Sequence, residues 1–457
     1  MQSFRSEIEN PLVEKDILDL AKKIAQFKAG EIHEEKFRSL RLARGVYGQR
    51  QQGVQMVRIK LPYGKIQFHQ WKRIADISDE YSTGNLHLTT RQDIQIHFVS
   101  LDRTPELWAK LEQDDITLRE ACGNTVRNIT ASPTSGIDPK ELFDVSPHAD
   151  AAFRYFLRNP ICQEMGRKIK MSFSNTEEDT SLAYLHDVGF IPKIQNGTRG
   201  FKVVVGGGLG AQPMLAHTAY EFLAEDQVIP FIESVLRVFD RHGERNSRHK
   251  ARMKFLIQKI GFEEFMNLVN AETKALKNHS FAIADASAWE VAEPSLKADI
   301  KAPETAEYQT WLDTNTFEQK QKGFHAVYVR ILNGNISSGT SRSLIEALNG
   351  YIGDDIRITI NQGLMLKFVP TANLPYVFQV LNAHGLAAPG ANSIANITAC
   401  PGTDTCNLAI SDSTHITSKL EEVINEEFPA LIHDSAMKIK ISGCMNACGQ
   451  HSMASIG

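Results

Sequence analysis

The sequence predicts an α+β protein that contains two copies of one unit, with mixed sheets, flanking helices and a pseudo-twofold relation between the copies. Two observations lead to this prediction. Short stretches of the first half recur in the same order in the second half, and they alternate between strand-like and helix-like hydrophobic patterns. A third observation distinguishes the copies, because only the second contains closely spaced pairs of cysteines.

Five stretches recur at offsets of 268 to 270 residues. The pairs are Gly53–Ile59 with Gly323–Val329, Trp71–Tyr81 with Leu344–Tyr351, His87–Val99 with Arg357–Val369, Asn128–Pro133 with Asn396–Pro401, and Lys168–Ser172 with Lys438–Ser442. The first and third pairs read as strands, and the second has apolar residues at helical spacing. One match would be weak evidence, but five in the same order indicate an internal duplication.

The duplication divides the chain into six parts. We expect an N-terminal helical segment at 1–49, strand–helix–strand half-domains at 50–115 and 317–386, a longer first α/β portion with a helical extension at 116–284, a linker at 285–316, and the second α/β portion at 387–457. Periodic apolar residues predict helices over Leu12–Lys28, Ile229–Phe239 and Met253–Ala271. The linker mixes Glu, Lys, Ala and Pro without a clear period.

The second copy is shorter than the first. In the first copy, Phe201–Gly210 reads as an apolar strand that ends in a glycine-rich turn, and its counterpart would begin near position 471, which is 201 plus 270. The sequence ends at Gly457. We therefore expect a fragment whose last domain is incomplete at its C-terminus.

Composition limits the class of protein. The 457 residues are 42% apolar and 23% charged, and the net charge of −4 comes from interspersed residues of both signs. This balance argues against a nucleic-acid partner, and the lack of an apolar run of about 18 residues argues against a membrane span. The N-terminus has no apolar leader and six cysteines are few, so we expect a cytoplasmic protein rather than a secreted one.

Four cysteines form two spaced pairs near the end of the chain. Cys400 and Cys406 are separated by five residues, and Cys444 and Cys448 by three. This pattern indicates a four-thiolate metal site, and the spacing with Pro401 favours an iron–sulfur cluster. Structural zinc, which usually has tighter pairs, and unligated thiols are the alternatives. For Cys122 and Cys162 we expect buried packing roles.

Basic residues gather on one side of the predicted strands. Between residues 86 and 99, alternation places Leu86, Leu88, Ile94, Ile96 and Phe98 toward a core and His87, Arg91, Gln95 and His97 on the other face. The same test places Met56, Arg58 and Lys60 opposite Val57, Ile59 and Leu61, and it places Lys168 and Lys170 opposite Ile169 and Met171. Each face could simply be solvated. Arg127 directly precedes the repeated Asn-Ile-Thr-Ala element whose twin carries Cys400, so we expect basic residues near a metal centre that binds a small oxyanion.

Together these motifs resemble the sirohaem-dependent sulfite and nitrite reductase family. The resemblance rests on the cysteine pairs, the duplication, Thr89-Thr-Arg-Gln92 and Val205–Gly210, and it runs from about Phe37 to the last residue. It implies ferredoxin-like half-domains at 50–115 and 317–386 and two copies of a sirohaem domain at 116–284 and 387–457. It also implies a [4Fe–4S] cluster held by Cys400, Cys406, Cys444 and Cys448, with Cys448 bridging to the sirohaem iron.

The resemblance implies roles for other residues. It assigns Arg58, Arg127, Lys168 and Lys170 to the substrate anion, and Arg91, Gln95 and His87 to the surroundings of the sirohaem carboxylates. Family members often carry an arginine where this chain has His87. The chain lacks flavin and NADPH motifs, so electrons would come from an external donor such as ferredoxin or a flavoprotein.

The implied activity is the six-electron reduction of sulfite to sulfide. Lys170 favours sulfite, because plant-type nitrite reductases tend to have asparagine there, and reduction of nitrite to ammonia is the alternative. Two further hypotheses stay open at this point, which are an inactive truncated copy and a non-catalytic metal-binding protein with solvated basic faces.

Overall fold

The computed structural model describes residues 10–285, 291–298 and 300–457, which form two compact units. Unit 1 combines the chain up to Leu118 with Val291–Gly457, and unit 2 is Arg119–Glu290. Residues 1–9 of the expected N-terminal segment, and 286–290 and 299 of the expected linker, lie outside the described residues.

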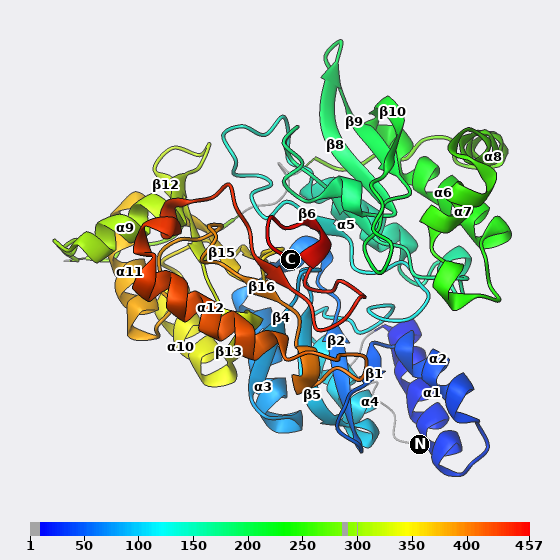
Figure 1. Ribbon diagram of the computed structural model, residues 1–457, viewed down its shortest axis with the longest axis horizontal. Coiled ribbons are helices and arrows are strands. Elements are labelled where there is room, and N and C mark those ends of the chain that lie inside the picture. The colour runs from blue at the N-terminus through cyan, green and yellow to red at the C-terminus, as the bar shows by residue number, and fades with distance from the viewer. Residues whose placement is uncertain (1–9, 286–290, 299) are drawn as a thin grey trace. The chain divides into compact units, whose positions relative to one another are not determined.

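Unit 1 contains two antiparallel five-stranded sheets with the same strand order. The first is β1 (Val46–Gly48), β2 (Val54–Ile59), β5 (Ile94–Ser100), β4 (Asn85–Leu88) and β13 (Asn335–Ser337). The second is β11 (Thr316–Glu318), β12 (Phe324–Val329), β15 (Leu364–Pro370), β14 (Ile356–Ile358) and β3 (Lys65–Ile66). Each half gives its short β3 or β13 to the other half's sheet, so the exchange is symmetric. Figure 1 labels β13 and its partner β4.

Side chains repeat this symmetry. The Gln92 amide donates to the carbonyl of Ile358 at 2.9 Å, and the Gln362 amide donates to the carbonyl of Leu88 at 3.1 Å. Both donors and both acceptors are 270 residues apart, and Gln92 and Gln362 both have left-handed backbones, with φ of 57° and 64°. The predicted internal duplication and α+β class are confirmed.

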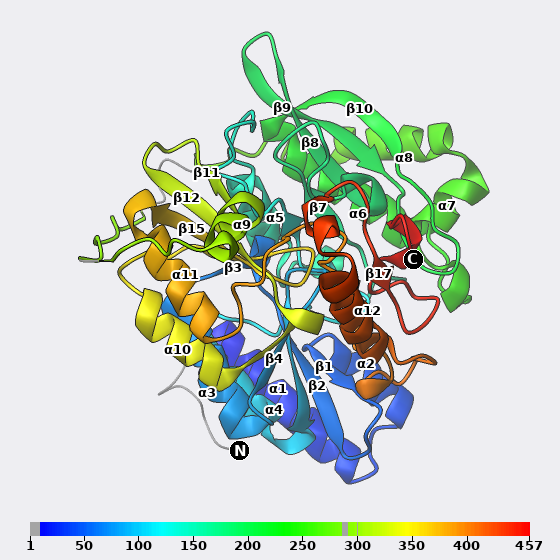
Figure 2. The same cartoon turned by 60° about the vertical axis from the view of Figure 1, so that its left-hand side comes forward.

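Helices cover the sheets of unit 1. They are α1 (Pro11–Lys28), α2 (Glu34–Leu42), α3 (Phe68–Tyr81), α4 (Thr104–Glu112), α9 (Ala306–Asn315), α10 (Ser338–Leu348), α11 (Leu374–Ala383) and α12 (Ser413–Glu427). Helix α1 packs on α2 and α4, while α3 and α10, which occupy equivalent positions in the two halves, pack on each other (Figure 2). Arg342 of α10 pairs with Asp76 of α3 at 3.2 Å, and a continuous apolar core runs through both halves.

Three details differ from the sequence expectations. The stretch 86–99 is a hairpin of β4 and β5 rather than one strand, because the chain turns at Thr89–Asp93. Phe98, expected in the core, has φ of 63° at an irregularity of the ladder and is 37% exposed, so Val99 is buried instead. The expected linker contains helix α9, which Thr305 caps by accepting from the N–H of Tyr308.

Unit 2 is built on one mixed sheet. Its order is β10 (His217–Ala224), β9 (Thr198–Val205), β8 (Val188–Gln195), β7 (Met171–Phe173) and β6 (Thr130–Ala131). Strands β6, β7 and β8 are parallel, and β8, β9 and β10 are antiparallel. The helices are α5 (Ser146–Phe156), α6 (Val228–His242), α7 (Met253–Ile260) and α8 (Phe262–Ala275). The single helix expected over 253–271 is two, because Gly261 has φ of 88° between α7 and α8.

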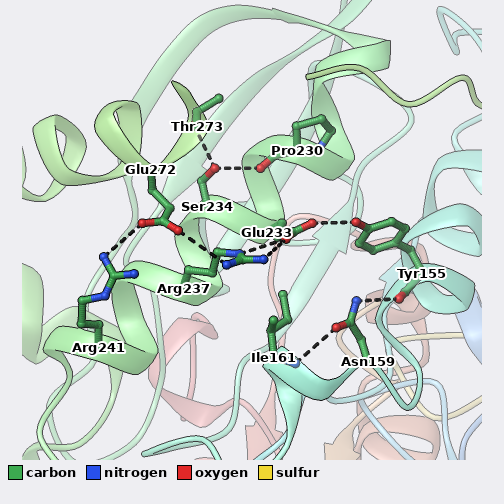
Figure 3. A network of polar contacts seen from close by, with 10 residues as sticks. All are labelled: Tyr155, Asn159, Ile161, Pro230, Glu233, Ser234, Arg237, Arg241, Glu272 and Thr273. Carbon is green, nitrogen blue, oxygen red and sulfur yellow. Dashed lines mark hydrogen bonds and ion pairs between the residues drawn. The ribbon is translucent and has the colours of Figure 1, made fainter. Parts of the chain in front are cut away.

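A polar network links the helices of unit 2. The hydroxyl of Tyr155 on α5 donates to Glu233 on α6 at 2.6 Å, and Glu233 also pairs with Arg237 at 2.6 Å (Figure 3). Arg237 reaches Glu272 on α8 at 3.8 Å.

Cys122 and Cys162 are 1% and 0% exposed, which confirms the expected packing roles.

Candidate functional site

Two short parallel strands bring the cysteine pairs of unit 1 together. Strand β16 (Thr398–Ala399) pairs with β17 (Lys440–Ile441), and Thr398 lies opposite Lys440. Cys400 follows β16 directly, and its N–H donates to the carbonyl of Ile441 at 3.2 Å. Because parallel strands end at the same sheet edge, the loops that carry both pairs begin side by side.

Two glycines allow these loops to approach closely. A Cβ at Gly443 would lie 2.8 Å from the Cα of Gly402, and a Cβ at Gly402 would lie 2.3 Å from the Ser413 hydroxyl. Gly402 also has a positive φ of 51°. Larger residues at these positions would push the two cysteine loops apart.

The four thiols lie in a common environment. The N–H of Gly443 donates to the sulfur of Cys400 at 3.1 Å, and the Asn446 amide donates to the sulfur of Cys444 at 3.4 Å. Burial raises the pKa of Cys406, and the neighbouring thiols of Cys448, Cys444 and Cys400 raise it further. The thiols are therefore within electrostatic range of one another, and all six cysteines are free of disulfides.

The described residues can also be compared with the ligand groups of single metal ions. Within the described ranges, no three His, Cys, Asp or Glu side chains are grouped as a single metal ion requires. A four-iron cluster holds its thiolates farther apart than one zinc ion does.

The first half-domain fixes the cysteine loops. The N–H of Arg50 donates to the carbonyl of Thr405 at 2.8 Å, and the Gln51 amide donates to the carbonyl of Asp404 at 2.8 Å. The Thr90 hydroxyl donates to the carbonyl of Cys448 at 2.9 Å. Arg50 and Gln51 were missed in the sequence analysis, since a contact made through backbone carbonyls leaves no residue pattern.

The Thr89-Thr-Arg-Gln motif is the turn of the β4–β5 hairpin. The Thr89 hydroxyl accepts the N–H groups of Arg91 and Asp93 at 3.1 and 3.2 Å, which shapes the turn. Thr90 reaches the cysteine loop and Gln92 reaches the second half. Arg91, a predicted cofactor-binding residue, is half-buried in this turn.

A row of polar side chains crosses the first sheet. Facing residues along neighbouring strands are Arg58 on β2, Gln95 on β5, His87 on β4 and Asn335 on β13. His87 is 3% and Gln95 7% exposed, so this face is covered rather than solvated. Met56 and Lys60, expected to point outward, are also buried, at 7% and 3% exposed.

Burial controls the charge of the histidines on this face. It lowers the pKa of His87 to about 4, where the Arg58 charge adds to the effect and the hydrogen bond to Asn335 opposes it. Burial, His87 and Arg58 lower the pKa of His97 to about 3. Both imidazoles are neutral at neutral pH, so His87 does not supply the positive charge that an arginine would supply there.

Unit 2 brings together three predicted anion-binding residues. Burial lowers the pKa of Lys168 well below its usual range, and the charges of Lys170, Arg127, Arg252 and Arg167 lower it further. Nearby positive charges disfavour the charged form of a lysine, which adds to the effect of burial. Arg127 is held by the carbonyls of Gly123 and Ala121 at 2.9 and 3.1 Å.

Residues distant in sequence organise this cation cluster. The buried Asp187 carboxylate accepts the N–H of Lys170 at 2.8 Å and pairs with Arg252 at 2.9 Å. Lys254 donates to the carbonyls of Gly208 and Leu209 in the glycine-rich turn, at 3.2 and 3.1 Å. The glycine-rich turn was predicted from the sequence, but Asp187, Arg252 and Lys254 were not, because no local pattern connects them to the Lys168–Lys170 strand.

The structure combines a duplicated α+β fold with a four-cysteine site in unit 1 and a cluster of cations in unit 2. Residues 122–277 match the family "Nitrite and sulphite reductase 4Fe-4S domain", and residues 47–114 and 317–384 match "Nitrite/Sulfite reductase ferredoxin-like half domain". The chain belongs to the sirohaem-dependent sulfite and nitrite reductase family.

Individual relatives agree with this assignment. "Sulfite reductase [ferredoxin] 1" of Mycolicibacterium paratuberculosis is 27% identical, over 90% of this chain and 74% of the relative. The "Assimilatory ferredoxin-dependent nitrite reductase" of Haloferax mediterranei is 28% identical, over 90% and 72%. The solved structure of the Mycobacterium tuberculosis NirA protein matches with a TM-score of 0.79 at 25% identity, covering 95% of this chain and 80% of that one.

The family's cofactors are sirohaem and a [4Fe–4S] cluster, and the enzyme is an oxidoreductase. The cysteine site fits the cluster, since it brings four thiols on two close loops within electrostatic range of one another, and the Cys400 sulfur already accepts an N–H hydrogen bond. None of the helices that the structure describes is long and apolar enough to cross a bilayer.

Proposed function

We propose that this protein reduces sulfite to sulfide with electrons from a ferredoxin. The observation that carries the choice of substrate is the lysine pair of unit 2, in which Lys168 and Lys170 lie among arginines. Sulfite carries more negative charge than nitrite, so a denser cation cluster favours it. At an effective dielectric of about 20, each unit charge pair at 4 Å contributes roughly 4 kcal/mol.

We assign the anion to four cations and the cofactors to separate groups. Arg58 in unit 1, and Arg127, Lys168 and Lys170 in unit 2, bind the oxyanion. Cys400, Cys406, Cys444 and Cys448 would hold the cluster, and Cys448 would also be the cysteine ligand of the sirohaem. Arg91 and Gln95 bind sirohaem carboxylates, with His87 beside them as a neutral hydrogen-bonding group.

The cofactors and the cations have different tasks in the proposed reaction. The sirohaem and its cluster supply electrons in succession. The cations hold an anion whose oxygens leave as water, and Lys168, with its lowered pKa, gives up a proton more readily than an ordinary lysine does.

The experiment compares steady-state kinetics on sulfite and on nitrite, with reduced ferredoxin as donor. We expect the larger kcat/KM on sulfite. Lys170→Asn should shift the ratio of the two kcat/KM values toward nitrite by about tenfold or more, since one cation is lost from the cluster. Lys140→Asn, at a lysine whose side chain is 72% exposed, is the control and should leave the ratio unchanged.

A wild-type preference for nitrite would replace sulfite by nitrite as the substrate, in line with the nitrite reductases among the relatives. Faster turnover with a reduced flavoprotein than with ferredoxin would overturn the proposed donor.

A further inference from the structure

A polar cavity lies beneath the first cysteine loop in unit 1. Its volume is about 190 Å³, which accommodates several water molecules at about 30 Å³ each. Strands β4, β5 and β13 and the loop that follows Cys400 line it. Thr83 and Asp404 at its rim are exposed, whereas His87 and Thr405 in its wall are 3% and 8% exposed. The cavity therefore connects solvent to a buried imidazole.

Asn335 fixes the proton on one nitrogen of His87. The side-chain oxygen of Asn335 accepts from the Asn85 amide at 3.1 Å and contacts Nδ1 of His87 at 3.0 Å. An amide oxygen only accepts, so His87 must donate from Nδ1. Its Nε2 then carries a lone pair that can receive a proton.

His97 is the second imidazole in the wall. Its ring centroid lies 5.8 Å from that of His87, close enough for one water molecule to bridge the two rings. Among the described residues, the His97 ring has no hydrogen-bond partner, and His97 lines the cavity.

The electrostatic surroundings keep both rings neutral. The charged groups that act on His87 are Arg58 on β2 and Asp404 in the cysteine loop. Arg58 also acts on His97, which lies on β5. A neutral imidazole transfers a proton by accepting it at one nitrogen and releasing another from the opposite nitrogen.

The polar row leads from the cavity toward a proposed substrate ligand. Asn335 and His87 stand at the cavity end, Gln95 follows, and Arg58 is at the far end. In the second half-domain, the position of Gln95 is taken by the apolar Met365. A continuous polar row is therefore a property of the first half.

We propose that this cavity, with His97 and His87, is the route by which protons enter from solvent toward the oxyanion at Arg58. The inference rests on the proposed function. Six electrons from ferredoxin and eight protons convert sulfite into hydrogen sulfide and three waters, or nitrite into ammonium and two waters. Each turnover thus consumes protons that a buried site must obtain from outside.

The test uses the holoenzyme with chemically reduced methyl viologen, so that donor docking does not limit the rate. His97→Ala should lower kcat about tenfold while KM for the anion stays within about twofold. The solvent deuterium isotope effect on kcat should increase, and added imidazole should restore at least half of the lost rate. His97→Gln, which keeps the size of the residue, should show the same loss without rescue.

His69→Ala, at an exposed histidine on α3, is the matched control and should behave like wild type. An unchanged kcat in both His97 variants, no recovery with imidazole, or a loss that merely follows reduced haem content would overturn the route while the proposed function stands. A wild-type enzyme that reduces neither anion would overturn the proposed function, and the route with it.

Discussion

The same row of four facing residues crosses both sheets of unit 1, but its chemistry differs between them. In the first half the row reads Arg58, Gln95, His87 and Asn335. In the second half it reads Tyr328, Met365, Arg357 and Lys65. The backbone was retained after duplication, since Phe98 and Phe368 both have positive φ, at 63° and 52°. The side chains were not retained, so the same backbone arrangement carries different chemical groups in the two halves.

In the second half, charged side chains fill the space that remains open as a cavity in the first half. We call them the ion cluster of the second half. Arg357 pairs with Asp355 at 2.9 Å, Lys367 lies 4.0 Å from the same carboxylate, and the Arg357 guanidinium stacks 4.8 Å from the Tyr63 ring centroid. The equivalent positions in the first half are Asn85, His87 and His97, which line the cavity. The first half therefore leaves a cavity where the second half has a buried cluster of paired charges.

The cysteines give the largest expected contrast between the copies. Cys448→Ser removes the proposed bridging thiolate, so we expect loss of both the cluster and the haem from the purified protein, measured by absorption and iron content. Cys122→Ser and Cys162→Ser change buried packing in the first copy and should leave both cofactors in place. Normal haem and cluster spectra in Cys448→Ser would remove the distinction between ligand and packing cysteines.

The ion cluster of the second half should govern stability rather than turnover. Asp355→Asn leaves Arg357 and Lys367 buried without their carboxylate, which we expect to lower the free energy of unfolding by about 3–5 kcal/mol. Turnover per folded molecule should be unchanged. Glu346→Gln, at an exposed acid on α10, is the control for charge loss and should change stability by less than about 0.5 kcal/mol.

The same carboxylate makes the second half sensitive to acid. Desolvation raises the pKa of Asp355, but the charges of Arg357, Lys367 and Lys65 outweigh it and hold the pKa below its usual range. A lowered folded-state pKa stabilises the protein above the unfolded value of about 3.9, and this stabilisation is lost as the pH falls below it. Denaturant titrations from pH 6 to 3 should show this loss in wild type and not in Asp355→Asn. Parallel pH profiles of the two proteins would contradict the role of Asp355.

The sequence predicted the duplication because matching strands and helices recur at one offset, and it predicted the metal site because thiolate ligands come in close pairs. Helix α1 was predicted from its apolar spacing within one residue of its observed start at Pro11. The exchange of β3 and β13 could not be predicted, since strands of two or three residues have no usable periodicity. The β4–β5 turn was missed because Thr89-Thr-Arg-Gln contains neither glycine nor proline.

Tertiary partners account for most of what was missed at the site. Asp187 acts on Lys170 across 17 residues, and Arg252 meets Asp187 across 65. The alternation rule placed His87 and Gln95 on the correct side of their strands but not in a buried setting, because the residues that cover them come from elsewhere in the chain. Periodicity reports which face a side chain takes and not what packs against that face.

The smallest expected effect in free energy comes from Lys168 and its counterpart Lys438, which occupy equivalent positions in the two copies. Removing either lysine should change turnover and the free energy of unfolding differently. Lys168→Met removes one of several crowded cations, so we expect turnover on the oxyanion to fall about 100-fold, or about 2.7 kcal/mol in barrier, while the free energy of unfolding stays equal or rises. Its counterpart Lys438 donates to the carbonyl of Asn392 and has no proposed contact with substrate. Lys438→Met should therefore keep wild-type turnover and lose about 1 kcal/mol of stability with that hydrogen bond. Steady-state assays and urea unfolding on both variants measure the two quantities, and equal losses of turnover in the two variants would show that the copies are not functionally distinct at this position.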